Sequence, residues 1–275
     1  MTTQTASPLD LTAVKQKQQA TWASGDYSAV ATLIVPVAER LVDLADLKAG
    51  AKVLDVATGS GNAALAAARL GADVVGTDYV TPLLQRGRER AIAEHLVVDF
   101  RFGDAEEIEF ADSSFDAVTS VFGSMFAPDH HQTAGEILRV TRPGGTIALA
   151  SWTPDGFIGQ LFRTVGQFVA PPAGVASPVL WGTADHLAEI FGPTVSWTHT
   201  LETFTFRFTS AEAFAQYFTA NYGPTLKALE AVGDRGGEFT SAIAELARGW
   251  NRLDEDEPVA IPATYLASVG VRDDG

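Results

Sequence analysis

The sequence of 275 residues contains no cysteine and only two methionines. The lack of cysteine excludes a disulfide framework and every zinc or iron–sulfur site that depends on thiolate ligands. It is typical of proteins in a reducing compartment, and we expect a cytoplasmic protein. We also predict no metal site, because the adjacent His130 and His131 have no third ligand at a suitable spacing.

Positive charge is scarce as well. The chain has 19 Lys and Arg against 34 Asp and Glu, which gives a formal net charge of −15. Proteins that bind nucleic acid usually present a basic surface that displaces counterions from phosphates. The acidic balance therefore disfavours DNA or RNA as a partner, and it also keeps a protein soluble.

Long apolar runs are missing too. No apolar stretch reaches the roughly 18 residues of a membrane span. The first ten residues are polar and lack the basic region and apolar run of a signal peptide. We therefore expect neither a membrane span nor a membrane partner. A homo-oligomer stays open, since the sequence alone identifies no exposed apolar surface.

Strands and helices alternate through the first 152 residues, after a polar helix at 11–24 and an amphipathic helix that Pro36 should kink or restart. Apolar and turn patterns predict strands at 52–57, 73–77, 96–102, 115–122 and 146–152, and helices at 62–70, 82–95 and 133–140. Such alternation implies parallel strands with right-handed crossovers. The sequence thus predicts a doubly wound, Rossmann-like α/β fold.

The pattern changes after Trp152. A strand at 195–208 and a last strand at 258–271 flank helical segments at about 210–252. We therefore expect three parts: an N-terminal helical cap at 1–48, a core at 49–154, and a C-terminal part at 155–275. The last part would complete the sheet with an antiparallel strand and carry a helical lid over the substrate. The charge run at 254–257 is expected to be a solvated linker.

A glycine-rich turn follows the first expected strand. It reads Asp55-Val56-Ala57-Thr58-Gly59-Ser60-Gly61. Glycines at such a turn let the backbone approach a ligand closely and take positive φ. Ligands of open α/β sheets bind outside the carboxyl ends of the strands, where the strand order reverses.

Two further acids stand at the ends of the next expected strands. Asp78 lies 19 residues after Gly59, and a carboxylate there can accept both hydroxyls of a ribose. Asp104, in Gly103-Asp104-Ala105, can read the edge of an adenine together with a backbone N–H. These three strand ends together predict an adenosine site.

The turn at 55–61 resembles motif I of class I methyltransferases that depend on S-adenosylmethionine (SAM). Later segments agree with this resemblance: Gly76-Thr77-Asp78, Phe102-Gly103-Asp104-Ala105-Glu106, Ser114-Phe115-Asp116-Ala117-Val118 and Arg142-Pro143-Gly144-Gly145-Thr146. It is strongest for the quinone-biosynthesis C-methyltransferases (methyltransferase type 11), in which a Phe-Gly pair such as Phe122-Gly123 also follows the fourth strand. It covers about residues 30–152, and Ala57 stands where glycine is commoner.

The resemblance implies a seven-stranded, mostly parallel sheet whose last strand is antiparallel, and SAM as the cofactor. It also implies roles for individual residues. The turn that begins at Asp55 would hold the methionine part of SAM, Asp78 the ribose, and Asp104 with Ala105 the adenine edge. Further cofactor contacts would come from Ala57, Gly59, Ser60 and Gly61 on the methionine, Tyr79 and Val80 on the adenine face, and Val121 near the methyl group.

Two other functions stay open. The spacing Gly59-x-Gly61-x-x-Ala64 nearly fits a dinucleotide fingerprint, which would indicate an NAD(P)-dependent oxidoreductase. Against it, Asp55 lies within the strand four residues before Gly59, and no Tyr-x-x-x-Lys pair of the short-chain dehydrogenases follows. The second alternative is a protein that binds SAM without transferase activity.

The substrate side is less well defined. His130 and His131 follow the fourth strand, where one of them could accept a proton from the acceptor, or they could simply precede a helix. Tyr222 is the best candidate for a polar contact. Aromatic side chains could wall a flat substrate, or could belong to the core: Trp22, Tyr27, Phe214, Tyr217, Phe218 and Tyr222, with Asn221 beside them. We expect SN2 methyl transfer to a small-molecule acceptor that is aromatic or heterocyclic, and not to nucleic acid. The sequence leaves O, N and C all open as the methylated atom.

Overall fold

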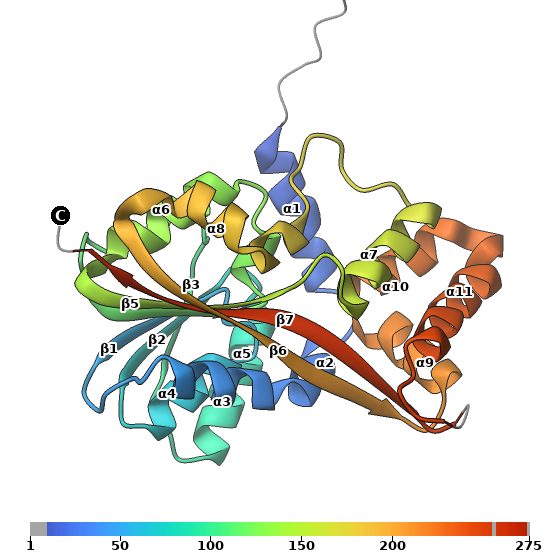
Figure 1. Ribbon diagram of the computed structural model, residues 1–275, viewed down its shortest axis with the longest axis horizontal. Coiled ribbons are helices and arrows are strands. Elements are labelled where there is room, and N and C mark those ends of the chain that lie inside the picture. Colours follow the sequence, from blue (N-terminus) through green and yellow to red (C-terminus); the bar gives the residue numbers. More distant parts are fainter. Residues whose placement is uncertain (1–9, 255–256, 274–275) are drawn as a thin grey trace, which may run out of the picture.

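The computed structural model describes residues 10–254 and 257–273, and it contains one seven-stranded sheet with helices on both faces (Figure 1). The strands follow the order β3-β2-β1-β4-β5-β7-β6. They are β1 (Lys52–Val56), β2 (Asp73–Asp78), β3 (Asp99–Phe102), β4 (Phe115–Val121), β5 (Thr141–Trp152), β6 (Val195–Phe208) and β7 (Val259–Arg272). Strands β1 to β5 pair in parallel, and β7 is antiparallel to both of its neighbours. The expected sheet is confirmed.

The helices lie in three groups around the sheet (Figure 1). Those described are α1 (Leu11–Trp22), α2 (Tyr27–Leu33), α3 (Val35–Leu44), α4 (Asn62–Arg69), α5 (Thr81–Ala93), α6 (His130–Val140), α7 (Phe157–Phe168), α8 (Ala184–Phe191), α9 (Ala211–Asn221), α10 (Gly223–Val232) and α11 (Gly236–Gly249). Helices α3, α4 and α5 cover one face, and α6 and α8 cover the other. Helices α7 and α9–α11 gather at the far end of the antiparallel pair β6–β7.

The strand order reverses between β1 and β4, because β1 pairs with β2 on one side and with β4 on the other. This reversal opens a crevice at the carboxyl ends of these strands. The order differs from the 3-2-1-4-5-6 order of dinucleotide-binding folds, since β7 is inserted antiparallel between β5 and β6. The glycine turn after β1 therefore lies at the point of the sheet where a ligand is expected.

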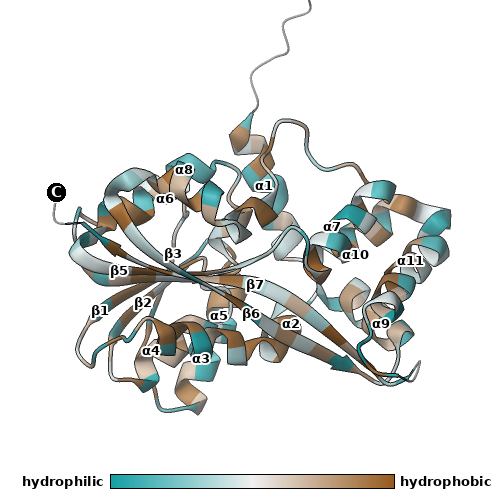
Figure 2. Cartoon of the chain, viewed as in Figure 1, coloured by the Kyte–Doolittle hydropathy of each residue, from teal (hydrophilic) through white to brown (hydrophobic). Residues whose placement is uncertain are grey.

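The antiparallel pair β6–β7 extends beyond the rest of the sheet. Its strands pair from Val195 with Arg272 to Phe208 with Val259, whereas β5 pairs with β7 only as far as Tyr265. The outer part of this pair packs against α9–α11, the helices that connect the two strands. The hydropathy colouring shows apolar residues along the central strands and polar ones on the outer turns of the helices (Figure 2).

The expected helical lid is packed into the main core. Phe214 and Phe218 of α9 stack with ring centroids 4.3 Å apart, and Phe206 of β6 lies against Phe218 at 5.5 Å. Phe239 of α11 is fully buried and contacts Phe168 of α7. These rings belong to the same buried cluster as the sheet, so the segment expected to be a lid packs against the core, and its role over a substrate stays a prediction.

Several boundaries differ from the predicted ones. Pro36 lies in the first turn of α3, so the chain restarts a helix there. The third strand begins at Asp99 rather than at 96. Helix α6 begins at His130, three residues early, because the Asp129 side chain caps it by accepting from the Gln132 N–H at 2.9 Å. The turn expected at 143–145 lies within β5, beside a register shift opposite β4. Of the charge run, residues 255 and 256 lie outside the described residues.

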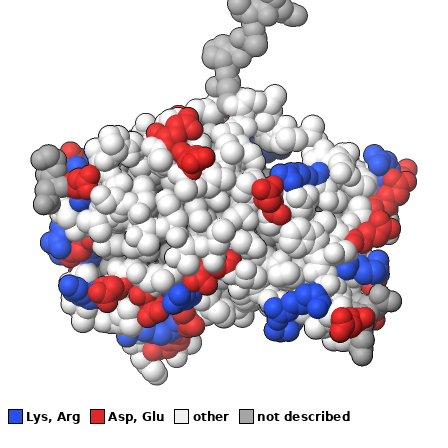
Figure 3. Space-filling model, viewed as in Figure 1, with Lys and Arg blue, Asp and Glu red and all other residues white. Residues whose placement is uncertain are grey.

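Charged side chains are mixed on the face of the molecule seen in Figure 3. Acidic and basic residues lie next to one another toward its two ends, and few charges lie over the middle. No helix in residues 10–254 or 257–273 combines the length and apolar character that crossing a bilayer requires.

Substitution of two glycines of α7 tests how closely this helix packs against its surroundings. A Cβ on Gly159 would lie 2.2 Å from the backbone oxygen of Pro154, whereas a Cβ on Gly166 would meet nothing within 4 Å. We expect Gly159→Ala to lower the free energy of unfolding by about 1–3 kcal/mol, because the backbone must shift. Gly166→Ala should leave it unchanged or raise it by up to ~1 kcal/mol, because alanine favours the helix. Urea unfolding measures both, and equal midpoints would contradict the packing described.

Candidate functional site

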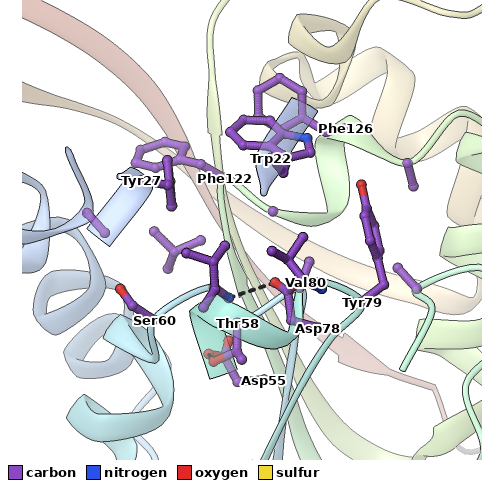
Figure 4. Close-up of a pocket in the computed structure, with 18 of the residues that line it drawn as sticks. Trp22, Tyr27, Asp55, Thr58, Ser60, Asp78, Tyr79, Val80, Phe122 and Phe126 are labelled. Carbon is purple, nitrogen blue, oxygen red and sulfur yellow. Dashed lines mark hydrogen bonds between the residues drawn. The ribbon is translucent and has the colours of Figure 1, made fainter. Parts of the chain in front are cut away.

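A hollow of about 850 Å³, counted with its open mouth, lies at the carboxyl ends of β1, β2 and β4 (Figure 4). Nearly all the cofactor residues expected from the sequence line it: Asp55, Ala57, Gly59, Ser60, Asp78, Tyr79, Val80, Asp104, Ala105 and Val121. The structure thus brings together residues that lie far apart in the chain.

Asp78 joins the glycine turn to the end of β2. One carboxylate oxygen accepts the Gly59 N–H and the other accepts the Val80 N–H, both at 2.8 Å. Burial raises the pKa of the Asp78 carboxyl to about 6, although backbone hydrogen bonds oppose the shift. At neutral pH the side chain is therefore a buried carboxylate, and it lies on the floor of the hollow (Figure 4).

Asp55 holds the glycine turn in place through hydrogen bonds to its carboxylate. One oxygen accepts the Thr119 hydroxyl of β4 at 2.9 Å, and the other accepts the Thr58 hydroxyl at 2.5 Å and the Ala64 N–H at 3.1 Å. Burial raises its pKa to about 6 against these hydrogen bonds. The expected cofactor residue therefore shapes the loop through three protein groups, while its side chain still borders the hollow.

The turn after β1 and the end of β4 touch closely. Ala57 has a φ of 52° and Phe122 a φ of 58°, both in the left-handed region that is costly for these residues. A Cβ on Gly123 would lie 2.4 Å from the Ala57 carbonyl oxygen. The Phe122-Gly123 pair is thus explained by contact, because only glycine lets the two strand ends meet here.

Ser60 and Gly61 are positioned from the side opposite the hollow. Arg90 of α5 donates to the Ser60 carbonyl at 2.8 Å and to the Asn62 side-chain oxygen at 2.7 Å. Gly61 has a φ of 88°, and a Cβ there would lie 2.7 Å from the Phe100 ring. Gly61 is therefore needed for the turn, but it is not among the residues that line the hollow.

Helix α1 closes the end of the hollow where adenine is expected to bind. Its Lys15 ammonium lies 2.5 Å from an Asp104 oxygen and 3.0 Å from Glu106. Gln19 donates to the Tyr79 carbonyl at 2.6 Å. Lys15 was not predicted, because nothing in a polar helix signals which of its side chains meets a strand end 89 residues away.

A second hollow of about 370 Å³, again including open space, adjoins the first, with which it shares five lining residues. We call it the aromatic chamber. It is lined by Trp22, Tyr27, Val30, Ile34, Phe122, Phe126, Trp152, Ile158, Phe206, Phe218 and Tyr222. Four of the proposed aromatic wall residues are there, Trp22, Tyr27, Phe218 and Tyr222. Phe214, Tyr217 and Asn221 are not among the lining residues, and Phe126 and Trp152 were not predicted.

The two expected catalytic histidines lie elsewhere. Neither lines the first hollow or the aromatic chamber in the described part of the chain. His130 is buried against Trp181, and its Nδ1 lies 2.9 Å from Nε2 of His186 on α8. The His131 side chain is 67% exposed and faces Glu189. The alternative interpretation placed the pair before a helix, and the two histidines are in fact the first residues of α6, directly after the Asp129 cap.

No group of three or more His, Asp or Glu side chains is placed to hold an ion within residues 10–254 and 257–273. The acidic residues of the hollow are instead held by backbone N–H groups, hydroxyls and Lys15. The arrangement suits an organic ligand with hydroxyl and amino groups.

His130 should make stability depend on pH. Burial, and then the nearby His186, lower its pKa from 6.5 to about 4. The unfolded chain therefore binds the proton more readily, so the free energy of unfolding should fall as pH drops from about 6.5 to 4, by up to roughly 3 kcal/mol. In His130→Gln this contribution to the pH dependence of the free energy of unfolding should disappear.

Urea unfolding at pH 7 and pH 4.5 measures the effect as a difference between the two proteins. The buried Asp55 and Asp78 have raised pKa values and give a slope of opposite sign, but they are present in both proteins and cancel. His131→Gln at the exposed neighbouring position is the control. The same slope in His130→Gln and the unchanged chain would refute the assignment.

Three comparisons bear on the family. Residues 54–149 match the family described as a methyltransferase domain. An uncharacterized protein of Mycobacterium tuberculosis (strain ATCC 25618 / H37Rv) is 39% identical over 236 residues, which cover 83% of this chain and 86% of that protein. The demethylmenaquinone methyltransferase of Thermus thermophilus is 40% identical over 139 residues, covering 49% of this chain and 63% of that enzyme.

The fold is also similar to that of a solved structure, a putative methyltransferase from Bacillus halodurans. It has a TM-score of 0.59 at 20% identity, with 86% of this chain and 98% of that chain covered. The strand order and the residues at the strand ends agree with these matches. The chain belongs to the class I SAM-dependent methyltransferases, within the methyltransferase type 11 group.

Proposed function

We propose that this enzyme binds SAM in the first hollow and transfers its methyl group to a small aromatic or heterocyclic molecule in the aromatic chamber. The observation that carries this proposal is the contact between the two hollows. They share Trp22, Tyr27, Ile34, Phe122 and Phe126, so a ligand in one lies beside a ligand in the other. Such neighbouring sites are what a direct transfer between two molecules requires.

The residues of the first hollow fit SAM. Ala57, Gly59 and Ser60 would lie along its methionine part, and Asp78 would accept the ribose hydroxyls. At the other end, Asp104 and Ala105 would meet the adenine edge, with Tyr79 and Val80 on its face. The hollow is lined by three carboxylates, Asp55, Asp78 and Asp104, and by one ammonium group, Lys15. This negative balance favours a ligand that carries a sulfonium cation.

When bound, SAM supplies a methyl group activated by a cationic sulfur, so much of the chemistry belongs to the cofactor. The protein's part is to hold the acceptor in line and to keep water out. Orientation of two reactants in a fixed geometry can lower a barrier by about 7–11 kcal/mol. The apolar rings of the chamber exclude water, and α9 and the α1–α2 segment hold them in place.

The chamber supports an acceptor that needs no base from the protein. Its lining contains no Asp, Glu, His, Lys or Arg among the described residues. The two tyrosines have pKa values raised by burial, so they remain protonated at neutral pH. A relative whose name gives demethylmenaquinone as its substrate also supports a flat ring system as the acceptor. The lack of cysteine supports a cytoplasmic setting.

Asp78→Ala should abolish tight cofactor binding. Charge-assisted hydrogen bonds are worth about 1.5–3 kcal/mol each, so loss of the ribose contacts should weaken binding at least about a hundredfold. Calorimetric titration with SAM, S-adenosylhomocysteine and NAD measures this. SAM and S-adenosylhomocysteine should bind to the unchanged protein, and NAD should not.

The control is Asp73→Asn, which changes an exposed acid at the start of the same strand, β2. It should leave all affinities unchanged. If NAD bound in place of the other two ligands, the proposed function would be wrong. Full affinity in Asp78→Ala would show that the ribose lies elsewhere.

Cofactor affinity should depend on pH through Asp78. The folded protein holds this carboxyl at a pKa of about 6, and only the ionised form accepts two ribose hydroxyls. The affinity for S-adenosylhomocysteine should therefore be constant above about pH 7 and fall roughly tenfold per pH unit below 6. Titrations between pH 7.5 and 5 test this, and an affinity that does not change below pH 6 would count against the ribose role.

A further inference from the structure

The end of the first hollow where adenine is expected already contains a cation. The Lys15 ammonium lies 2.5 Å from Oδ2 of Asp104, and both side chains line the hollow. The other carboxylate oxygen of Asp104, Oδ1, accepts the Glu106 N–H at 2.9 Å. Oδ2 is therefore the oxygen left for an adenine amino group, and Lys15 already donates to it.

Lys15 has a second partner that is not part of the lining of the hollow. Its ammonium lies 3.0 Å from Oε2 of Glu106, whose side chain is only 7% exposed. Oε1 of Glu106 accepts the Asp129 N–H at 2.8 Å, which fixes this carboxylate in place. Because an ammonium group has three donors, Lys15 can give up its hydrogen bond to Asp104 and stay on Glu106.

Lys15 keeps its positive charge in this setting. Burial by itself would lower the pKa of the Lys15 ammonium, but the hydrogen bonds and charges of Asp104 and Glu106 raise it above its ordinary value. An ammonium group only donates hydrogen bonds. The amino group of adenine would also donate to the Asp104 carboxylate, so the two groups need the same acceptor and cannot pair with each other.

Other contacts hold helix α1 at the hollow independently of Lys15. Gln19 donates to the Tyr79 carbonyl at 2.6 Å, and Gln18 donates to the Phe126 carbonyl at 3.1 Å. At the end of the helix, the Trp22 ring stands edge-on to the Phe126 ring at 4.8 Å. The Lys15 ammonium can therefore leave one of its partners while the helix stays in place.

We propose that Lys15 is an internal competitor for the adenine site and thereby sets the affinity for the cofactor. Lys15 withdraws from Asp104 when an adenine amino group donates to that carboxylate, and it keeps its ion pair with Glu106. The exchange gives up one partly exposed ion pair, which corresponds to a factor of about two to five in affinity. This proposal rests on the proposed function, because it concerns the cofactor of the same site.

Two ligands that differ only at the edge of the base test the competition. S-adenosylhomocysteine carries an amino group there, and S-inosylhomocysteine carries an oxo group. Calorimetric titration of the full-length protein measures both affinities. In Lys15→Met, S-adenosylhomocysteine should bind about two- to fivefold more tightly, because Asp104 has lost its competing partner. S-inosylhomocysteine should bind no more tightly, since its oxo group cannot donate to Asp104.

Glu106→Gln should have the opposite effect. The amide keeps the shape of the side chain but removes the charge that draws Lys15 away from Asp104. Lys15 then holds Asp104 more firmly, and S-adenosylhomocysteine should bind about two- to fivefold more weakly. Lys17→Met is the matched control, because it removes the same charge from an exposed position of α1. It should leave both affinities unchanged.

The outcomes separate the two proposals. Failure of S-adenosylhomocysteine to bind to the unchanged protein would overturn the proposed function. If that ligand binds, weaker binding in Lys15→Met would show that Lys15 holds the cofactor in place. An unchanged affinity would show that Asp104 accepts from both groups at once, and an equal gain for the two ligands would place the effect of Lys15 elsewhere than at the amino group. Each of these three results would overturn the competition alone.

Discussion

Two buried carboxylates at neighbouring strand ends, Asp55 and Asp78, determine the shape of the site. Burial raises both pKa values from 3.8 to about 6, which corresponds to a cost of about 3 kcal/mol for each charge at neutral pH. This cost remains after hydrogen bonds from backbone N–H groups and from the hydroxyls of Thr58 and Thr119 have opposed the effect of burial. These hydrogen bonds fasten the turn after β1 to β2, β4 and α4, so the carboxylates define the backbone that a ligand meets.

The acceptor side depends on the opposite kind of packing. There the walls are rings from elements that are distant in sequence, and Phe122 shows how the two halves meet. Its backbone lies at the end of β4 against the glycine turn, while its ring stacks on Trp152 with centroids 3.8 Å apart. The first hollow, which carries the charged groups, and the apolar aromatic chamber thus meet at this residue, one of the five that line both. On the proposed function, this separation would place ionised groups beside the cofactor and keep them away from the acceptor.

A feature of this site could be predicted from the sequence when it depends on residues that are close together in the chain. The turn at 55–61 and the acids Asp78 and Asp104 could be predicted because each lies at or just after the carboxyl end of a strand. Parallel strands bring these ends to one edge of the sheet. The residues that complete the walls were missed, Lys15 and Trp152 among them, because their contacts depend on how distant elements pack. The histidines were misplaced for a local reason: the Asp129 cap starts α6 early and turns His130 toward His186.

Helix α1 is held at the first hollow by few buried groups. None of its residues is fully buried, and its contacts include the polar ones of Lys15 and Gln19 and those of the partly buried Trp22 ring at its end. Helices α4 and α9, by contrast, bury most of one face. Elements with few buried apolar contacts open at the lowest free energy. A ligand enclosed by β1, β2 and α1 would therefore exchange by release of α1, and the Lys15 ion pairs with Asp104 and Glu106 would oppose that release less strongly as salt concentration rises.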